Sequence, residues 1–193
     1  TWKFVFSTNP QTRNKDFYKF DQDIESFDNI KVPGQMSLQG YGLVQYTNTM
    51  YPWDGVVAGD APVVSETLNE VGGYVKDVVI DKELLGKKIY ISFQGVQTAF
   101  YLYVNEQFVG YSEDSFTPAD FDITDYVKEG VNRIGVEVYA RATGAWLEDQ
   151  DYWRLYGIFR DVYLYAIPKT HVRDLFIHTN VSDDYKSANL TFD

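Results

Sequence analysis

Residues 88–111 read KIYISFQGVQTAFYLYVNEQFVGY, and this stretch decides the fold class. Its apolar side chains recur at every second position in residues 89–93 and again in residues 100–104, which is the period of a half-buried β-strand. Asn105-Glu106 follows the second run and favours a tight turn into residues 108–111. The stretch therefore predicts three short strands, the last two of them joined as a hairpin.

Strand-like patterns continue outward from this stretch, and helical ones are scarce. The same alternation occurs in residues 134–138, and a further short strand is expected at residues 162–164. No segment keeps apolar residues three and four positions apart for more than about two helical turns, so the pattern lacks the crossover helices of a parallel α/β fold. Short strands separated by turn residues predict an all-β sandwich or barrel.

The composition is that of a folded domain and limits its partners. Of the 193 residues, 45% are hydrophobic and 17% are aromatic, which suits pleated β surfaces. The formal net charge of −11 disfavours binding to nucleic acid and to anionic membranes, because both attract clustered Lys and Arg. Cysteine is absent, so disulfides and thiolate metal sites are excluded. No apolar run approaches the roughly 20 residues that cross a bilayer.

Two features of the chain indicate its organisation. Glycine and proline gather in residues 32–62 together with aromatic residues, so we expect a long ordered loop there. Ile167-Pro168 marks a domain boundary, because proline ends a strand ladder, and residues 167–193 are too few to form a core of their own. Both ends of the sequence lie inside apparent strands, so we expect a piece of a longer protein.

The strongest candidate for a functional site is residues 146–154, WLEDQDYWR, which hold the carboxylates Glu148, Asp149 and Asp151. Carboxylates this close repel one another unless a cation, an arginine or hydroxyl donors compensate. The cluster could hold a hard cation, accept hydrogen bonds from sugar hydroxyls, or supply the carboxylate pair of a glycosidase. The alternative is a set of ordinary loop charges that pair with nearby arginines, namely Arg141, Arg154 or Arg160.

Asn48 is a second candidate. It ends the run Tyr46-Thr47-Asn48 within the loop rich in glycine and proline. Its amide offers an acceptor and two donors, which suits a sugar hydroxyl, but asparagine is also an ordinary turn residue in such a loop. The residues alone leave both interpretations open.

Several stretches of the sequence resemble a known family. Residues 147–154 (LEDQDYWR) and 157–162 (GIFRDV) closely resemble the signature of the LacZ-type β-galactosidases of glycoside hydrolase family 2. Three further stretches resemble the family in the same order, namely residues 32–48, 93–105 and 110–124. The resemblance covers essentially residues 1–166.

The resemblance implies a fold and a place in a larger enzyme. Residues 1–166 are expected to form a galactose-binding-like jelly-roll β-sandwich, which is the non-catalytic sugar-binding domain of the family. Residues 167–193 are expected to be the truncated start of an immunoglobulin-like β-sandwich. Retaining hydrolysis of β-galactosides in the family depends on two glutamates of a later catalytic barrel domain. We therefore expect no catalytic residue here and no activity of the chain alone, and the resemblance favours a cytoplasmic, homo-oligomeric parent.

Two residues acquire implied roles by their motif position. Asp151 is implied to contact the galactosyl 6-hydroxyl and to ligate a sodium ion together with groups of the barrel domain. Asn48 is implied to line the same galactose subsite. Glu148, Asp149 and Arg154 are expected to orient the loop behind these contacts.

The sequence also departs from the family pattern in two places. The family carries an aspartate before the glycine that corresponds to Gly144, and Thr143 stands there in this chain. A Mg²⁺ ion of the parent enzyme is therefore not assigned to these residues. The stretch 52–75 diverges as well, and we expect it to be a loop.

Two interpretations from other functional classes stay open. An autonomous carbohydrate-binding module would need an exposed, coplanar aromatic set, whereas Trp2, Phe4 and Trp153 are expected in the core or at an interface. A purely structural scaffold domain would leave turnover of the full-length enzyme unchanged when Asp151 is replaced by Ala.

Overall fold

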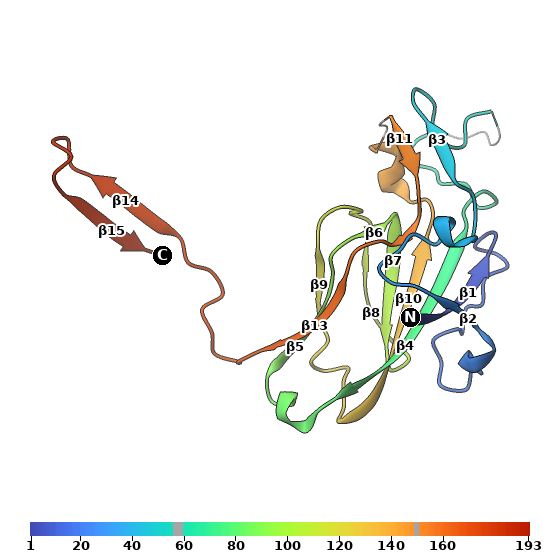
Figure 1. Cartoon of the computed structure of the whole chain (residues 1–193), viewed down its shortest axis with the longest axis horizontal. Helices are drawn as coiled ribbons and strands as arrows, with labels where there is room; N and C mark the ends of the chain where they lie inside the picture. The colour runs from blue at the N-terminus through green and yellow to red at the C-terminus, as the bar shows by residue number, and fades with distance from the viewer. Residues whose placement is uncertain (56–59, 149–150) are drawn as a thin grey trace.

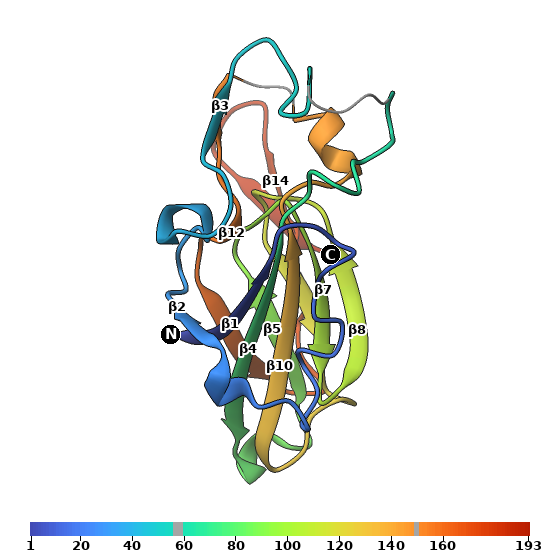
Figure 2. The ribbon, with the colours of Figure 1, turned by 90° about the vertical axis from the view of Figure 1, so that its right-hand side faces the viewer.

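The computed structural model describes residues 1–55, 60–148 and 151–193, and nearly all of its regular structure is β-strand. The strands form two facing layers (Figures 1 and 2), a jelly-roll β-sandwich. The predicted all-β sandwich is confirmed. The helical segments in these ranges are single 3-10 turns, η1 (Ile24–Ser26), η2 (Ser37–Gln39), η3 (Lys82–Leu84) and η4 (Thr143–Trp146). None of the helices in the described part of the chain is long and apolar enough to cross a membrane.

The larger layer is an antiparallel sheet of six strands in the order β2-β1-β4-β10-β7-β8. Its strands are β1 (Trp2–Ser7), β2 (Asp28–Ile30), β4 (Val71–Ile80), β7 (Ala99–Val104), β8 (Gln107–Ser112) and β10 (Gly130–Tyr139). β4 and β10 form the longest ladder, which runs from the pair Gly130↔Ile80 to the pair Tyr139↔Val71. This ladder is the centre of the sheet.

The smaller layer is the three-stranded sheet β13-β5-β9, accompanied by short pairs. Its strands are β5 (Lys88–Phe93), β9 (Ala119–Asp122) and β13 (Val162–Ile167). The short pairs are β6 (Val96–Gln97) with β12 (Gly157–Ile158), and β3 (Gln45–Thr47) with β11 (Tyr152–Arg154). The strands predicted at residues 89–93, 100–104, 108–111, 134–138 and 162–164 are all present.

The core lies between the two layers and explains the alternation in the sequence. Ile134, Val136 and Val138 of β10 pair with Val104, Leu102 and Phe100 of β7, and all six side chains are buried. They belong to one apolar cluster with the buried side chains of β5, Ile89, Ile91 and Phe93. Each fully buried side chain of this size stabilises the fold by about 1.5–3 kcal/mol before conformational entropy is subtracted.

The predicted hairpin connects β7 and β8. Asn105 and Glu106 form the turn with φ of 48° and 68°, the paired positive values that a two-residue hairpin of matching twist requires. The Asn105 amide also donates hydrogen bonds to the main-chain oxygen of Tyr126 and to Oδ1 of Asn132, at 2.8 and 2.7 Å. The turn is therefore fixed both by its own conformation and by contacts to Tyr126, before β10, and to Asn132, within β10.

The expectation of a loop throughout residues 52–75 is wrong at its end, because residues 71–75 are the first half of β4. Gly72 and Gly73 suggested a loop, yet both lie in the sheet. A Cβ at Gly72 would lie 2.8 Å from the Phe4 ring, and one at Gly73 would lie 2.9 Å from Cγ1 of Val5. Because these glycines lack a side chain, they leave room for Phe4 and Val5 of the neighbouring strand β1, and they do not form a turn.

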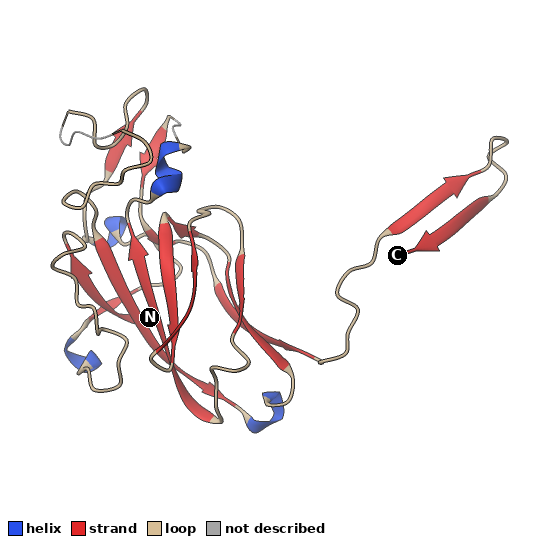
Figure 3. Cartoon of the chain, turned by 180° about the vertical axis from the view of Figure 1, so that it is seen from behind, coloured by secondary structure: helices blue, strands red, loops and turns tan. Residues whose placement is uncertain are grey.

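Residues beyond Ile167 form a separate hairpin. β14 (Ile177–Val181) and β15 (Ala188–Phe192) pair with each other and with no other strand of the described ranges. Figures 1 and 3 show the hairpin set apart from the sandwich, at the end of a segment without regular structure. The first strand after Pro168 begins at Ile177. That residues 167–193 begin an immunoglobulin-like domain stays a prediction.

A glycine at the start of β12 offers a test of packing in this fold. Gly157 has φ of +126°, and a Cβ there would lie 2.6 Å from the Met36 nitrogen and 2.9 Å from the Tyr74 hydroxyl. Gly157→Ala should therefore lower the free energy of unfolding by about 2–4 kcal/mol, through overpacking added to backbone strain. Gly130→Ala is the control, since Gly130 has φ of +86° with open space around it. It should cost only about 1 kcal/mol. Urea unfolding measures both, and equal losses would contradict the packing argument.

Candidate functional site

The candidate site is a two-stranded ribbon at one end of the sandwich. β3 and β11 pair antiparallel, with Tyr152 opposite Thr47, Trp153 opposite Tyr46 and Arg154 opposite Gln45. Figure 1 shows the ribbon projecting beyond the two main layers. The pairing brings together the two segments that the sequence singled out separately.

Asp151 precedes β11 on the exposed side of the ribbon. The Tyr46 hydroxyl donates a hydrogen bond of 2.5 Å to its Oδ1 atom. That hydrogen bond is the main reason that the pKa of Tyr46 is raised above its ordinary value. Tyr46 thus orients the carboxylate while leaving it accessible to solvent.

Two aromatic rings accompany this carboxylate. Tyr46 is 52% exposed and Trp153 is 58% exposed, and their ring centroids lie 5.5 Å apart with planes inclined by 51°. Trp2 and Phe4, in contrast, are buried in the core as expected. The expectation for Trp153 is therefore wrong as far as the core is concerned, and an interface with another part of the protein stays a prediction.

Asn48 directly follows β3 and is exposed. The terminal pair of the ribbon, Thr47↔Tyr152, brings Asn48 and Asp151 to the same end of it. The Asn48 Oδ1 atom accepts a hydrogen bond of 2.8 Å from the Thr49 amide. The Asn48 Nδ2 group makes no hydrogen bond to the described residues.

Arg154 holds the base of the ribbon. Its side chain is buried, and it donates from Nε to Thr47 Oγ1 at 3.1 Å and from Nη1 to the main-chain oxygen of Glu148 at 2.5 Å. The guanidinium also lies 4.1 Å from the centroid of the Tyr152 ring. These contacts join both strands to the turn before β11, which suits the predicted loop-orienting role of Arg154.

The other two predicted loop-orienting residues are Glu148 and Asp149. Burial is the main reason that the pKa of Glu148 is raised, and its neighbours Asp114 and Glu113 add to this effect. The Ser115 hydroxyl and the charge of Arg154 act in the opposite direction. Asp149 lies outside the described residues.

A complete metal site is not found here. Within residues 1–55, 60–148 and 151–193, no group of three or more His, Cys, Asp and Glu side chains is close enough to hold a metal ion. Thr143, where the family carries an aspartate, donates its hydroxyl to both carboxylate oxygens of Glu113, at 3.0 and 2.7 Å.

An aromatic cluster next to the ribbon was missed by sequence reasoning. Tyr51 stacks on Trp53 with ring centroids 5.2 Å apart, and both contact Trp146 at 4.7 Å. Tyr51 donates its hydroxyl to the main-chain oxygen of Trp146, and the Trp146 indole N–H donates to the main-chain oxygen of Val63. The density of aromatic residues in 46–53 was the signal that could have revealed it. The cluster ties η4 to the loop that follows β3.

The sequence of the sandwich and ribbon matches a known protein family. Residues 1–168 match the family described as "Glycosyl hydrolases family 2, sugar binding domain". The chain belongs to this family. The resemblance noted in the sequence is thereby confirmed over nearly the whole sandwich and its signature motif.

The relatives of this sugar-binding domain are larger proteins. It is 56% identical over 189 residues to "Beta-galactosidase" of Clostridium acetobutylicum, covering 98% of this chain and 21% of the relative. It is 41% identical over 199 residues to "Beta-galactosidase large subunit" of Lactobacillus helveticus, covering 97% of this chain and 32% of the relative. The chain thus spans a fifth to a third of the length of these relatives.

A solved structure supports the same fold. "Crystal Structure of Bacteroides Uniformis beta-glucuronidase" aligns with a TM-score of 0.70 at 21% identity, covering 100% of this chain and 21% of that one. Identity this low shows the fold alone. The sugar-binding domain therefore has the fold of one part of that larger chain.

The turn that carries Trp146 offers a test of its electrostatics. Burial alone would raise the pKa of Glu113, but hydrogen bonds from Thr143, Tyr111 and the Gly144 amide lower it below its ordinary value. Thr143→Val should therefore raise this pKa, as NMR titration of the carboxyl carbon would show. Thr117→Val is the control, because Thr117 donates to Asp114 instead.

The same shift makes the turn sensitive to acid. Because the folded pKa of Glu113 is lowered, its stabilising contribution is present above the unfolded pKa of about 4.3 and is lost as pH falls through the folded pKa. An unchanged pKa of Glu113 in Thr143→Val would show that this hydroxyl does not stabilise the carboxylate.

Proposed function

We propose that this sugar-binding domain completes the galactoside subsite of a larger, retaining β-galactosidase whose catalytic residues lie in another part of the protein. The observation that carries the proposal is the β3–β11 register, whose terminal pair Thr47↔Tyr152 brings the exposed residues Asn48 and Asp151 to the same end of the ribbon. The relatives named as β-galactosidases support the substrate class. The catalytic part would be the barrel domain that the family resemblance implies, and the parent would be cytoplasmic and homo-oligomeric by the same resemblance.

The ribbon's role in this proposal is recognition rather than bond cleavage. A carboxylate accepts hydrogen bonds from sugar hydroxyls, and an amide can both donate and accept, so Asp151 and Asn48 together suit a galactosyl ring. Tyr46 restrains the carboxylate in advance, which reduces the ordering that binding requires. Correct placement of the ring would raise the rate at the catalytic residues, although the ribbon itself exchanges no proton with the substrate.

A sodium ion fits one end of this arrangement. Asp151 has an exposed carboxylate with lone pairs beyond the one that Tyr46 uses, and hard cations prefer oxygen ligands. We propose that Asp151 supplies one ligand to Na⁺ and that the barrel domain supplies the others. When bound, the ion would add a positive charge that attracts sugar hydroxyls. A Mg²⁺ ion of the parent is not assigned to this chain, since Thr143 stands where the family has an aspartate and donates its hydroxyl to Glu113.

The alternative with a specific observation in its favour is an autonomous carbohydrate-binding module. Tyr46 and Trp153 are exposed and adjacent, as a sugar-stacking platform would require. Their planes are inclined by 51°, however, so they do not form one flat surface for a sugar ring.

The first test replaces Asp151 in the full-length enzyme that contains this domain. Asp151→Asn should lower kcat/KM for a β-galactoside about 10- to 100-fold, because a charge-assisted hydrogen bond to the sugar is lost. The response of activity to Na⁺ should be lost as well. The control is Asp23→Asn, since the Asp23 side chain caps nothing at η1 and is exposed. Unchanged turnover in Asp151→Asn would favour a purely structural domain.

The second test separates a shared subsite from an autonomous module. The isolated chain is titrated with galactose and with lactose, in sodium and then in potassium buffer, and followed by NMR. We expect binding no tighter than about several millimolar and no effect of the cation, because the domain holds only part of the site. Micromolar binding with shifts centred on Trp153 would instead identify an autonomous module.

A further inference from the structure

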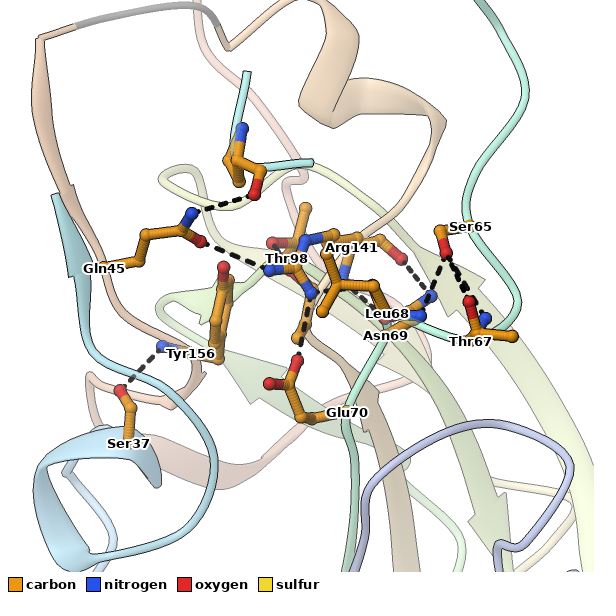
Figure 4. A network of polar contacts seen from close by, with 12 residues as sticks. Ser37, Gln45, Ser65, Thr67, Leu68, Asn69, Glu70, Thr98, Arg141 and Tyr156 are labelled. Atoms are coloured by element: carbon orange, nitrogen blue, oxygen red, sulfur yellow. Dashed lines mark hydrogen bonds and ion pairs between the residues drawn. The ribbon is translucent and has the colours of Figure 1, made fainter. Parts of the chain in front are cut away.

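A buried arginine connects the ribbon to the sandwich. Arg141 lies two residues beyond the end of β10 and is only 2% exposed. Its Nη1 group donates to the main-chain oxygen of Leu68 at 2.7 Å and to Oε2 of Glu70 at 3.0 Å. Its Nη2 group donates to Oε1 of Gln45, in β3, at 3.4 Å. One guanidinium thus contacts the segment before β4 and a strand of the ribbon (Figure 4).

Gln45 extends this connection into the loop after the ribbon. Its side-chain Nε2 donates to the main-chain oxygen of Pro52 at 2.8 Å. The amide of Gln45 therefore accepts from Arg141 with one atom and holds Pro52 with the other. Asn48 lies on the chain between these two anchored points, at Gln45 and Pro52.

The arginine itself is held on the sandwich side. Asn69 and Arg141 exchange two hydrogen bonds, from the Arg141 amide to Asn69 Oδ1 at 2.8 Å and from Asn69 Nδ2 to the Arg141 oxygen at 2.9 Å. The main-chain N–H of Ala140 also donates to the main-chain oxygen of Glu70 at 2.9 Å. The base of the side chain is thus fixed at the end of the β4–β10 ladder, so its guanidinium reaches Gln45 from a rigid support.

The identity of the residue matters for this arrangement. Glu70 and Arg141 are both buried, and a buried ion pair does not by itself stabilise a fold strongly, because both charges lose their hydration. A planar guanidinium, however, can donate in several fixed directions at once, whereas a lysine ammonium is a point charge. Only an arginine can pair with Glu70 and contact Gln45 in this geometry.

We propose that Arg141 is a positioning residue for the sugar subsite, acting through Gln45 on the segment that carries Asn48. The proposal rests on the proposed function of the ribbon. It predicts that loss of the Arg141–Gln45 contact changes sugar recognition more than it changes stability. A merely structural arginine would lower stability and leave KM unchanged.

The chain offers a matched control at the other end of β10. Arg133 is 7% exposed and makes a bidentate pair with Asp77 at 2.8 and 3.0 Å. It also donates to the main-chain oxygen of Lys19 at 2.8 Å, much as Arg141 donates to that of Leu68. Arg133 makes no hydrogen bond or ion pair with the ribbon in the described part of the chain, so Arg133→Lys tests stability without changing the subsite.

The experiment compares variants of the full-length enzyme. In Arg141→Lys and in Gln45→Met, KM for a β-galactoside should rise on the order of tenfold, because a misplaced contact group binds the sugar less well. The double variant should be no worse than the weaker-binding single variant, since each single variant already removes the Arg141–Gln45 contact, and Gln45→Met removes the Pro52 contact as well. Arg133→Lys should lower Tm by as much as Arg141→Lys does and leave KM unchanged. Additive effects in the double variant, or an unchanged KM in Arg141→Lys, would overturn the proposal.

Hydrogen exchange separates this proposal from the function on which it rests. In Arg141→Lys and Gln45→Met, the amides of β3 and of residues 48–52 should exchange faster, while those of β7 stay unchanged. If Asp151→Asn leaves KM unchanged, the proposed function fails, and exchange alone then decides whether Arg141 positions the ribbon. Unaltered exchange in β3 of Arg141→Lys would overturn the positioning role whatever the kinetics show.

Discussion

The β4–β10 ladder is the constraint on which the rest of the structure depends. It is the longest pairing in the larger sheet and carries the central part of the apolar core on its inner face. Two arginines with buried side chains lie along this part of the fold: Arg133 pairs across the ladder with Asp77, and Arg141, just beyond the ladder, pairs with Glu70. The sandwich is stable because of its apolar faces, and the Arg141 ion pair links the end of β10 to the segment before β4.

The ribbon follows different physical rules from the sandwich. β3 and β11 are three-residue strands that contribute no buried apolar side chain, so the hydrophobic effect contributes little to their position. Directional contacts replace it. Arg154 joins the strands to the turn before β11, Arg141 reaches Gln45 from the sheet, and the Tyr51, Trp53 and Trp146 rings pack beside them. Sugar recognition at Asp151 and Asn48 would thus depend on polar anchors rather than on the core.

Local sequence patterns predicted most of the sandwich and failed where packing overrides them. Alternation found β5, β7 and β10, and Asn105-Glu106 located the hairpin, because both signals are carried by adjacent residues. Gly72 and Gly73 were interpreted as part of a loop, yet the rings and branched side chains of β1 need the space above them. Trp153 is exposed rather than part of the core, since burial depends on what lies opposite in space, and its place at an interface stays a prediction.

The sequence by itself determined the all-β sandwich, the family signature at residues 147–154 and the candidates Asp151 and Asn48. These follow from period-two alternation, turn residues and a contiguous motif, all of which are local. Only the tertiary structure decided that β3 pairs with β11, that Tyr46 binds Asp151 and that Arg141 reaches Gln45. The residues in each of these contacts lie about a hundred positions apart in the sequence. A local pattern therefore specifies neither the register of β3 with β11 nor the direction in which the Arg141 guanidinium donates.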